Sequence, residues 1–454
     1  MSDTEAVMWA VEKDPALRSD FCNLTILDHA PDEKRLRATV DRALVAIPRL
    51  AQRVVAAPLR LVPPEFAADP SLDLDYHVRR IAVPAPGDMR SVLDVCEQLA
   101  ESSLDRSRPL WEFTMIDGLA GGRAALLQKV HHTISDGVGG LKLSLALLDL
   151  EPDPPAPEEP LEAPTPSEAG SSGPFEALRA AVGDATRRNI DAMRRVVGGT
   201  AGALVRPAQL PGRAVDSVRV ARSIGRQGFV ADTAHSDLVA RRSLRRHFEV
   251  HSVSLPALKE AANSLGGSVN DAYVTALCAG LGRYHERYGS EVSELRLAMP
   301  VSTRERGDDS ANRFAPARVL VPIRPAHDPR ALFAEVHARL HTAKQEPALT
   351  ALDGLAGFAT LLPTAFLVAF TRNQARTIDF AASNLRGSPL PLYLAGARIV
   401  ASYPFGPRAG AALNVTTLGY CDSLDIGVNV DPAAVTDIDG LMLDLAAAFD
   451  DLLA

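Results

Sequence analysis

Two adjacent histidines, His131 and His132, precede Asp136 and Gly137 in the segment KVHHTISDGVGG. Histidine can take up and return a proton near neutral pH, because its unperturbed pKa is about 6.5. An aspartate followed by a glycine favours a sharp turn with unusual backbone angles. The pattern therefore predicts a general base held where a strand ends and a turn begins.

The length and composition of the chain restrict the class of protein that could carry this base. At 454 residues the chain is expected to form more than one domain. Its net charge of −8 argues against a nucleic-acid partner. The four cysteines are far apart and show no metal-ligand spacing, as expected of free thiols in a reducing cytoplasm. The N-terminus lacks a basic signal-peptide start, and no stretch reaches the roughly 20 apolar residues that cross a bilayer. A cytoplasmic location is expected.

Composition divides the chain into three parts. Residues 1–150 are predicted to form a first domain, 151–246 a connector, and 247–454 a second domain. The connector begins with a stretch rich in Pro, Glu, Ser and Ala, which favours an extended linker. The arginines that follow are interleaved with aliphatic residues, which fits either a helix on an anionic membrane or a solvated helix packed on the body.

Hydrophobic periodicity predicts strands and helices mixed in both halves. The predicted helices span 31–48, 91–103, 141–150, 254–264, 272–287 and 435–453. The predicted strands span 73–83, 111–117, 124–130, 295–301, 317–323, 379–383, 397–403, 413–420 and 423–430. This mixture favours a layered α/β or α+β protein with two domains.

Several further motifs occur in a fixed order along the chain. They are PLWE at 109–112, HHTISDG at 131–137, ND at 270–271, MPVSTR at 299–304, SNLRG at 383–387 and ALNVT at 412–416. With this set the chain resembles the wax ester synthase/diacylglycerol acyltransferase family. The histidine motif alone, HHxxxDG, is shared with chloramphenicol acetyltransferase, carnitine acyltransferases and condensation domains. The chain departs from the family pattern at Leu385-Arg386, where a proline usually follows the serine-asparagine pair.

The resemblance implies two chloramphenicol-acetyltransferase-like domains that face one another, with an active-site channel between them. One mouth of the channel would admit an acyl-coenzyme A, and the other an alcohol. The implied enzyme is an O-acyltransferase that makes triacylglycerol from diacylglycerol, or wax ester from a long-chain alcohol. Acyl-coenzyme A would be a co-substrate, with no further cofactor and no metal.

This chemistry assigns a role to each residue of the histidine motif. His132 is the expected general base for the acceptor hydroxyl, an effect worth about 10²–10⁴-fold in rate. Its imidazolium would then protonate the leaving thiolate, so no acyl-enzyme is needed. His131 is expected to orient or pack, and Asp136 to hold the histidine loop, with Arg304 as one candidate partner. A purely structural histidine pair is the alternative.

Four other residues are candidates for substrate contact or for shaping the site. Asn270 would position the substrate or support the oxyanion, or else cap the helix that follows it. Ser302 and Asn384 would line the channel, although turn chemistry also explains them. Gly137 is expected to let residues 138–150 fold back. Trp111 is expected in the core rather than on the substrate.

Two other functions remain open. One is acyl transfer or condensation onto a specialised-metabolite alcohol, with the acyl group delivered by a separate carrier protein. The other is a non-catalytic lipid-droplet or membrane-associated protein, suggested by the arginines within 179–226. Peripheral attachment to the inner membrane face or to lipid droplets is therefore an alternative to a purely cytoplasmic location.

Overall fold

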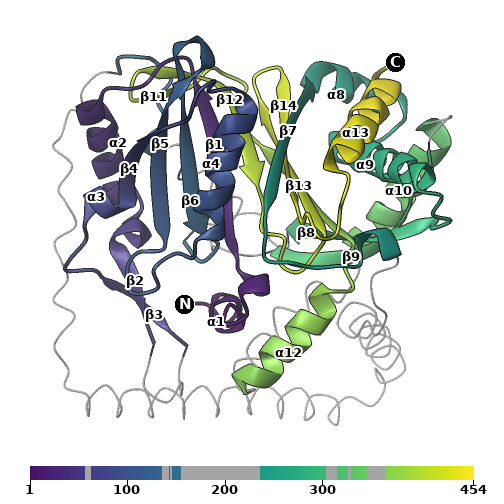
Figure 1. The fold of residues 1–454 in the computed structure, drawn as a ribbon, viewed down its shortest axis with the longest axis horizontal. Coiled ribbons are helices and arrows are strands. Elements are labelled where there is room, and N and C mark those ends of the chain that lie inside the picture. Colours follow the sequence, from purple (N-terminus) through teal and green to yellow (C-terminus); the bar gives the residue numbers. More distant parts are fainter. Residues whose placement is uncertain are drawn as a thin grey trace, which may run out of the picture.

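The computed structural model describes residues 1–56, 63–134, 143, 146–154, 236–302, 314–325, 329–345 and 363–454. Within these ranges two six-stranded sheets stand side by side, with helices on the outer side of each and one further helix, Met89–Glu101, between them (Figure 1). The prediction of a layered α/β protein with two such halves is confirmed.

The first sheet is built mainly from the N-terminal half. Its order is β11 (Tyr393–Leu394), β12 (Ala397–Phe405), β1 (Asp20–Leu27), β6 (Arg123–His131), β5 (Trp111–Leu119) and β4 (Val78–Ala82). The predicted strands 111–117 and 124–130 are present as β5 and β6, which pair antiparallel across a short turn at Ala120–Gly122. The predicted strand at 73–83 is wrong in its first part. Asp73 caps a short helix there, α3 (Leu74–His77), and the strand begins only at Val78.

Helices cover both faces of the first sheet. α2 (Glu33–Ala46) buries Leu36 and Val40 on one face, together with Trp111 of β5. The Trp111 indole Nε1–H donates to the Leu50 carbonyl over 2.7 Å, which satisfies its only polar group, and the predicted core role of Trp111 is confirmed. α4 (Met89–Glu101) packs on the other face through side chains that include Cys96.

The second sheet is built from the C-terminal half. Its order is β7 (His247–Ser254), β14 (Ser423–Val430), β13 (Leu413–Tyr420), β10 (Phe380–Arg386), β8 (Glu294–Ser302) and β9 (Phe314–Pro322). Its core lies between the strands and the helices α8 (Leu255–Ser264), α9 (Val269–Arg287), α10 (Pro329–Lys344) and α13 (Ile438–Leu453). α9 is buried along almost its whole length, as expected of a helix that is apolar all round.

The remaining elements lie at the lower edge of the two sheets in Figure 1. They are α1 (Asp3–Val11), α12 (Thr364–Ala375) and the two-stranded sheet of β2 (Gln52–Val55) and β3 (Glu65–Ala68). Short helical turns also occur at Pro15–Leu17, Pro48–Ala51 and Asp237–Val239. α1 and α12 contact one another, although more than 350 residues separate them in the sequence.

The strand β12 connects the two sheets. It comes from the C-terminal half but pairs with β1 in the first sheet, so the two sheets do not divide at a single point of the sequence. β12 also packs beside β14, where the Ser402 backbone N–H donates to Asp425 Oδ2 over 2.8 Å. Gly427 of β14 is so close to β12 that a Cβ there would lie 2.1 Å from the Pro404 carbonyl oxygen. The domain boundaries at 150 and 246 stay predictions.

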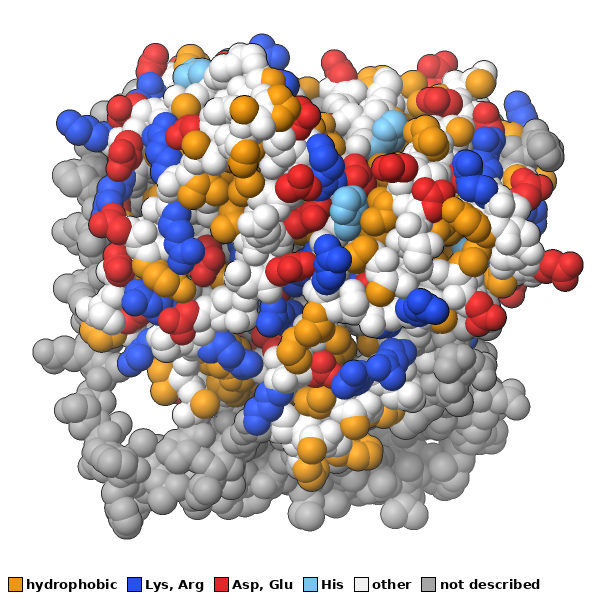
Figure 2. All heavy atoms as spheres, viewed as in Figure 1, with side chains coloured by type: hydrophobic (Ala, Val, Ile, Leu, Met, Phe, Trp, Pro, Cys, Tyr) orange, Lys and Arg blue, Asp and Glu red, His pale blue; other side chains and the backbone are white. Residues whose placement is uncertain are grey.

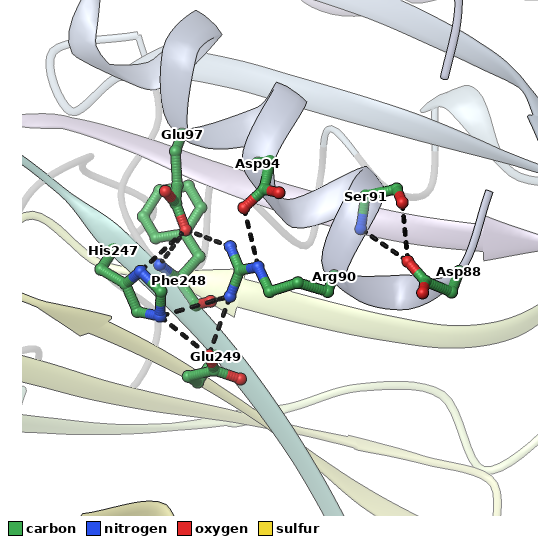
Figure 3. Close-up of polar contacts among 8 residues, drawn as sticks. All are labelled: Asp88, Arg90, Ser91, Asp94, Glu97, His247, Phe248 and Glu249. Atoms are coloured by element: carbon green, nitrogen blue, oxygen red, sulfur yellow. Dashed lines mark hydrogen bonds and ion pairs between the residues drawn. The ribbon is translucent and has the colours of Figure 1, made fainter. Parts of the chain in front are cut away.

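A second connection joins α4 to β7 (Figure 3). Arg90 Nη1 lies 2.8 Å from both the Phe248 carbonyl oxygen and Glu249 Oε1. Glu97, on the next turns of α4, accepts the Phe248 backbone N–H over 2.8 Å and also pairs with Arg90. Because these contacts satisfy main-chain groups of β7 directly, they fix the position of the second sheet against the first.

Candidate active site

The histidine pair lies where β6 ends and a turn begins, as the sequence predicted. His131 is the last residue of β6 and pairs with Asp20, the first residue of β1. The backbone N–H of His132 continues this pairing and donates to the Ser19 carbonyl over 3.1 Å. The main chain of both histidines is therefore held by regular hydrogen bonds to its neighbours.

The ring of His131 is buried and fully hydrogen-bonded. Its Nδ1 lies 3.1 Å from the backbone N–H of Thr133, which can only donate, and 2.7 Å from the Thr133 hydroxyl. Since Nδ1 must accept, the ring proton of the neutral imidazole lies on Nε2. Nε2 is 2.6 Å from Glu12 Oε1, so it donates to that carboxylate. Both ring nitrogens of His131 are thus engaged by Thr133 and Glu12, and the orienting role predicted for His131 stays a prediction.

One oxygen of Glu12 holds the ring of His131 directly and reaches His132 only through Ser19. Glu12 Oε1 also accepts the backbone N–H of Ser19 over 2.7 Å, and the carbonyl of Ser19 accepts from His132. The Glu12 side chain is only 8% exposed, so this charge is largely removed from water and is compensated by the hydrogen bonds it accepts.

α1 delivers Glu12 to the histidines, and its own ends are well capped. Ser2 and Glu5 form a capping box at its start, and Glu12 stands at its C-cap. Arg49 then ties the helix to the histidine turn, because its Nη1 lies 2.7 Å from Glu5 Oε1 and 2.6 Å from the Thr133 carbonyl oxygen.

His132 is half-buried, and its ring packs against Phe21 of β1 with a centroid separation of 5.0 Å. The side chain thus lies on the β1 side of the turn. Asp136, Gly137 and Arg304 lie outside the described residues, so the roles predicted for them stay predictions.

Asn270 is the second residue of α9, and the helix-capping alternative for it is wrong. Ser268 is the N-cap and forms a capping box with Asp271. The Asn270 side-chain amide nitrogen Nδ2 is buried and makes no hydrogen bond to any described residue. A buried amide of this kind is costly unless a further group accepts from it.

The neighbouring carboxylate of Asp271 is fully engaged. It accepts from the Ser268 backbone N–H over 2.9 Å, from the Ser268 hydroxyl over 2.8 Å, and lies 3.0 Å from His337 Nδ1. Burial by itself raises the pKa of this carboxyl, but the hydrogen bonds from Ser268 and His337 outweigh it and hold the pKa below its ordinary value.

Asn384 and Ser302 belong to the second sheet. Asn384 lies on β10, and its Oδ1 accepts from the Thr417 hydroxyl of β13 over 3.1 Å. Ser302 ends β8, which runs parallel to β10. Tyr273, one turn after Asn270, donates to the Val415 carbonyl of the same strand β13 over 2.8 Å. The structure therefore ties Asn384 and the start of α9 to one strand, whereas the histidines end a strand of the first sheet.

Sequence reasoning missed the residues that support the histidines, which are Glu12, Ser19 and Arg49. The Ser2-x-x-Glu5 spacing is a recognisable helix-start signal and could have revealed α1. No local pattern links Glu12 to a histidine 119 residues later, because that contact depends on the tertiary fold.

Comparison with known proteins agrees with this fold and with the motif set. The model of the wax ester synthase/diacylglycerol acyltransferase catalytic domain matches residues 1–273, and that of the WS/DGAT C-terminal domain matches residues 310–453. A relative from Mycobacterium tuberculosis, assigned by its name to the diacylglycerol O-acyltransferases, is 35% identical over all of this chain and 91% of its own length. A second relative from that organism, with the same name, is 28% identical over 95% of this chain and 92% of its own.

Solved structures show the same architecture. The wax ester synthase/diacylglycerol acyltransferase from Marinobacter aquaeolei VT8 superposes with a TM-score of 0.63 at 21% identity, covering 99% of this chain and 97% of the other. The starter condensation domain of rhizomide synthetase, solved in complex with C8-CoA and Leu-SNAC, superposes with a TM-score of 0.55 at 13% identity, covering 99% and 92%. The matches to both family models and to the mycobacterial relatives place this chain in the wax ester synthase/diacylglycerol acyltransferase family of acyltransferases.

Proposed function

We propose that this chain is an acyl-coenzyme A-dependent O-acyltransferase that forms triacylglycerol from diacylglycerol, or wax ester from a long-chain alcohol. The observation that carries the proposal is the rigid mounting of the histidine pair. Glu12 Oε1 holds the ring of His131 and the backbone beside His132 at once. Preorganisation of this kind is what a general base needs, because proton transfer depends on geometry before it depends on pKa.

In the proposed reaction His132 removes the proton from the acceptor hydroxyl as its oxygen attacks the thioester carbonyl. The tetrahedral intermediate then expels the coenzyme A thiolate, which takes the proton back from His132. The ester and the free thiol are the products, so the proton balance closes without any external acid. Asn270 is the proposed donor to the negative oxygen of the intermediate, supported by its buried amide nitrogen with no acceptor among the described residues.

Direct transfer is favoured over a covalent acyl-enzyme. Cys22, on the strand that pairs with β6, is the cysteine nearest in register to the histidines. Burial raises its pKa to about 12, so it is a neutral thiol at physiological pH and a poor nucleophile. We therefore propose that the acceptor hydroxyl, rather than Cys22, is the attacking group.

The substrates of this reaction are apolar, and we propose that the enzyme works in the cytoplasm with peripheral contact to the inner membrane face or to lipid droplets. None of the helices in the described ranges has the length and apolar character that a bilayer crossing requires. Flotation of the purified protein with diolein-containing vesicles, compared with protein alone, tests the peripheral contact.

A donor-by-acceptor screen tests the proposed activity. Purified protein is incubated with palmitoyl-coenzyme A or a palmitoyl-loaded carrier protein, each with diolein, hexadecanol or a panel of smaller alcohols, and the products are identified by mass spectrometry. The proposal predicts triolein-like or wax-ester products from the coenzyme A donor. Products only from the carrier-bound donor or the small alcohols would instead indicate a specialised-metabolite acyltransferase. No product with any pair, together with vesicle binding, would indicate a non-catalytic lipid-surface protein.

A further inference from the structure

A cavity of about 310 Å³ opens where the two sheets meet, and arginine dominates its lining. Seven arginines and two acidic residues line it. Figure 2 shows Lys and Arg side chains gathered at this junction, around and above α1 and α12. The local excess of positive charge contrasts with the net charge of −8 of the whole chain. The volume of the cavity lies at the lower end of the range typical of small-molecule sites.

The cavity lies at the same end of the strands as the histidine pair. Arg18, which lines it, is two residues before Asp20, and Asp20 pairs with His131 across β1 and β6. Arg408 follows the end of β12, and Asp431 follows the end of β14. The carbonyl that holds the His132 backbone belongs to Ser19, the residue next to Arg18. One wall of the cavity is therefore continuous with the segment that positions His132.

Part of the arginine lining is structural. Asp431, which is fully buried, lies 2.6 Å from Arg408 Nη1 and accepts the Ser243 hydroxyl over 2.5 Å. Arg246 pairs with the buried Asp20 over 3.0 Å. These ion pairs neutralise charge and fix the loops that line the cavity. Arg408 and Arg246 therefore act mainly as structural residues, which we call the frame of the cavity.

Three other arginines of the lining, Arg18, Arg245 and Arg376, form no ion pair with a described carboxylate. Arg18 donates to the Glu101 carbonyl over 2.8 Å. Arg242 belongs to the frame instead, because its three guanidinium nitrogens all donate to backbone carbonyls, those of Gly410, Val239, Arg241 and Ile378. Carbonyl acceptors orient a guanidinium without neutralising it. Arg245 and Arg376 are exposed, and the nearby Arg372 is paired with Asp14 over 3.2 Å.

We propose that this arginine cavity binds the phosphate groups of coenzyme A, with the pantetheine arm directed along Arg18 and Ser19 toward His132. The choice of ligand rests on the proposed function, because acyl transfer to an alcohol needs an activated donor. The chemistry of recognition comes from the cavity itself. Arginine forms bidentate, charge-assisted hydrogen bonds to phosphate, and several convergent arginines suit a ligand that carries more than one phosphate.

A phospholipid headgroup offers the same chemistry but fits the site less well. In a glycerophospholipid the phosphate is joined through glycerol to two acyl chains, whereas the arginines line a concave site. The wall of this site includes Arg18, the neighbour of the Ser19 that holds the His132 backbone. Coenzyme A carries a diphosphate and a separate 3′-phosphate at the end of a thin arm, which matches this shape.

The test is calorimetric titration of coenzyme A into the full-length protein without any acceptor, so that binding is read independently of catalysis. The variants are Arg18→Gln and the double variant Arg245→Gln/Arg376→Gln. Each is expected to raise the Kd for coenzyme A by about tenfold or more, as the loss of a charge-assisted contact implies. Arg123→Gln, an exposed arginine at the opposite end of β6, has the same change in charge as Arg18→Gln; it is the matched control for that variant and should leave the Kd unchanged. Because Arg245 and Arg376 are exposed, their replacement should leave the melting temperature within about 2 °C of the wild type.

Two further arms identify the phosphate that is recognised. The wild type should bind 3′-dephospho-coenzyme A more weakly than coenzyme A, and this preference should shrink in the double variant. Vesicles of phosphatidylcholine with phosphatidic acid should bind wild type and double variant alike. A double variant that keeps its Kd for coenzyme A, or that loses only vesicle binding, overturns the assignment.

The outcomes separate this proposal from the proposed function. If the protein binds coenzyme A through these arginines but has no transferase activity, the assignment of the cavity as a coenzyme A site stands and the proposed function fails. If the protein is an active transferase and the arginine variants keep the wild-type KM for palmitoyl-coenzyme A, the proposed function stands and the cavity is not the donor site.

Discussion

The carboxylate of Glu12 lies 2.6 Å from Nε2 of His131, across 119 residues of sequence. The same oxygen accepts the backbone N–H of Ser19, whose carbonyl holds His132. One acidic side chain at the end of α1 thus sets the orientation of the first histidine and the backbone position of the second.

Replacing this carboxylate should therefore reduce turnover. Glu12→Gln keeps the shape of the side chain but removes the charge that His131 and Ser19 face. We expect kcat to fall about tenfold, as the loss of a charge-assisted hydrogen bond implies, with KM for both substrates nearly unchanged. Steady-state kinetics with palmitoyl-coenzyme A and diolein measure both constants.

The control is Asp3→Asn, an exposed acidic residue on the same helix, which should behave as the wild type. A rise in KM with an unchanged kcat in Glu12→Gln would show that Glu12 acts on substrate binding rather than on the position of the base.

The histidine motif could be found in the sequence, but the residues that hold it in place could not. Strand and helix periodicity located β5, β6 and α9, because each has a long apolar pattern. The pattern failed for β1, where Asn23 and Thr25 interrupt the apolar run of a central strand. Their polar groups are satisfied across the sheet, since Asn23 Nδ2 donates to Gln128 Oε1 over 3.2 Å and to Ser402 Oγ over 3.0 Å.

The sequence also does not show which sheet a predicted strand joins, because that depends on pairing with strands far away in the chain. The strand predicted at 397–403 exists, as Ala397–Phe405, but nothing local shows that it joins the first sheet beside β1 rather than the second. The order of motifs predicted the family, and the family match confirmed it. The contacts of Glu12 and Arg49 depend on how α1 packs, which periodicity in a nine-residue helix does not encode.

The close packing of β14 against β12 predicts a sharp sensitivity at Gly427. A Cβ there would lie 2.1 Å from the Pro404 carbonyl oxygen, and main chain cannot move aside as a flexible side chain could. We expect Gly427→Ala to lower the free energy of unfolding by about 1–3 kcal/mol. Urea denaturation followed by circular dichroism measures the change.

Gly419→Ala, on the neighbouring strand β13, is the matched control. Its Cβ would approach only a leucine methyl group at 3.3 Å, so a much smaller effect is expected. Equal stability of the two variants would show that the junction between the sheets is looser than the structure indicates.

The carboxylate of Asp271 predicts a pH-dependent contribution to stability. Its pKa in the folded protein is held below the ordinary 3.8, although burial acts in the opposite direction, by hydrogen bonds from Ser268 and His337 and by the charge of Lys344. Ionised Asp271 therefore stabilises the fold above its unfolded-state pKa, and this contribution is lost as the pH falls through the lower folded-state pKa.

We expect Asp271→Asn to reduce the free energy of unfolding by about 1 kcal/mol at pH 7, as for other capping residues. The difference from the wild type should shrink as the pH is lowered from 5 to 3.5. Urea titrations at both pH values measure it, with Glu260→Gln on the exposed face of α8 as the control. A difference that stays constant or grows toward pH 3.5 would contradict the assignment.

The rate of acyl transfer by His132→Gln tests the account most directly. With palmitoyl-coenzyme A and diolein both saturating, loss of the general base should lower kcat by about 10²–10⁴-fold. The variant should keep the melting temperature of the wild type and its Kd for coenzyme A. A folded His132→Gln protein that forms triacylglycerol at the wild-type rate would contradict the central claim.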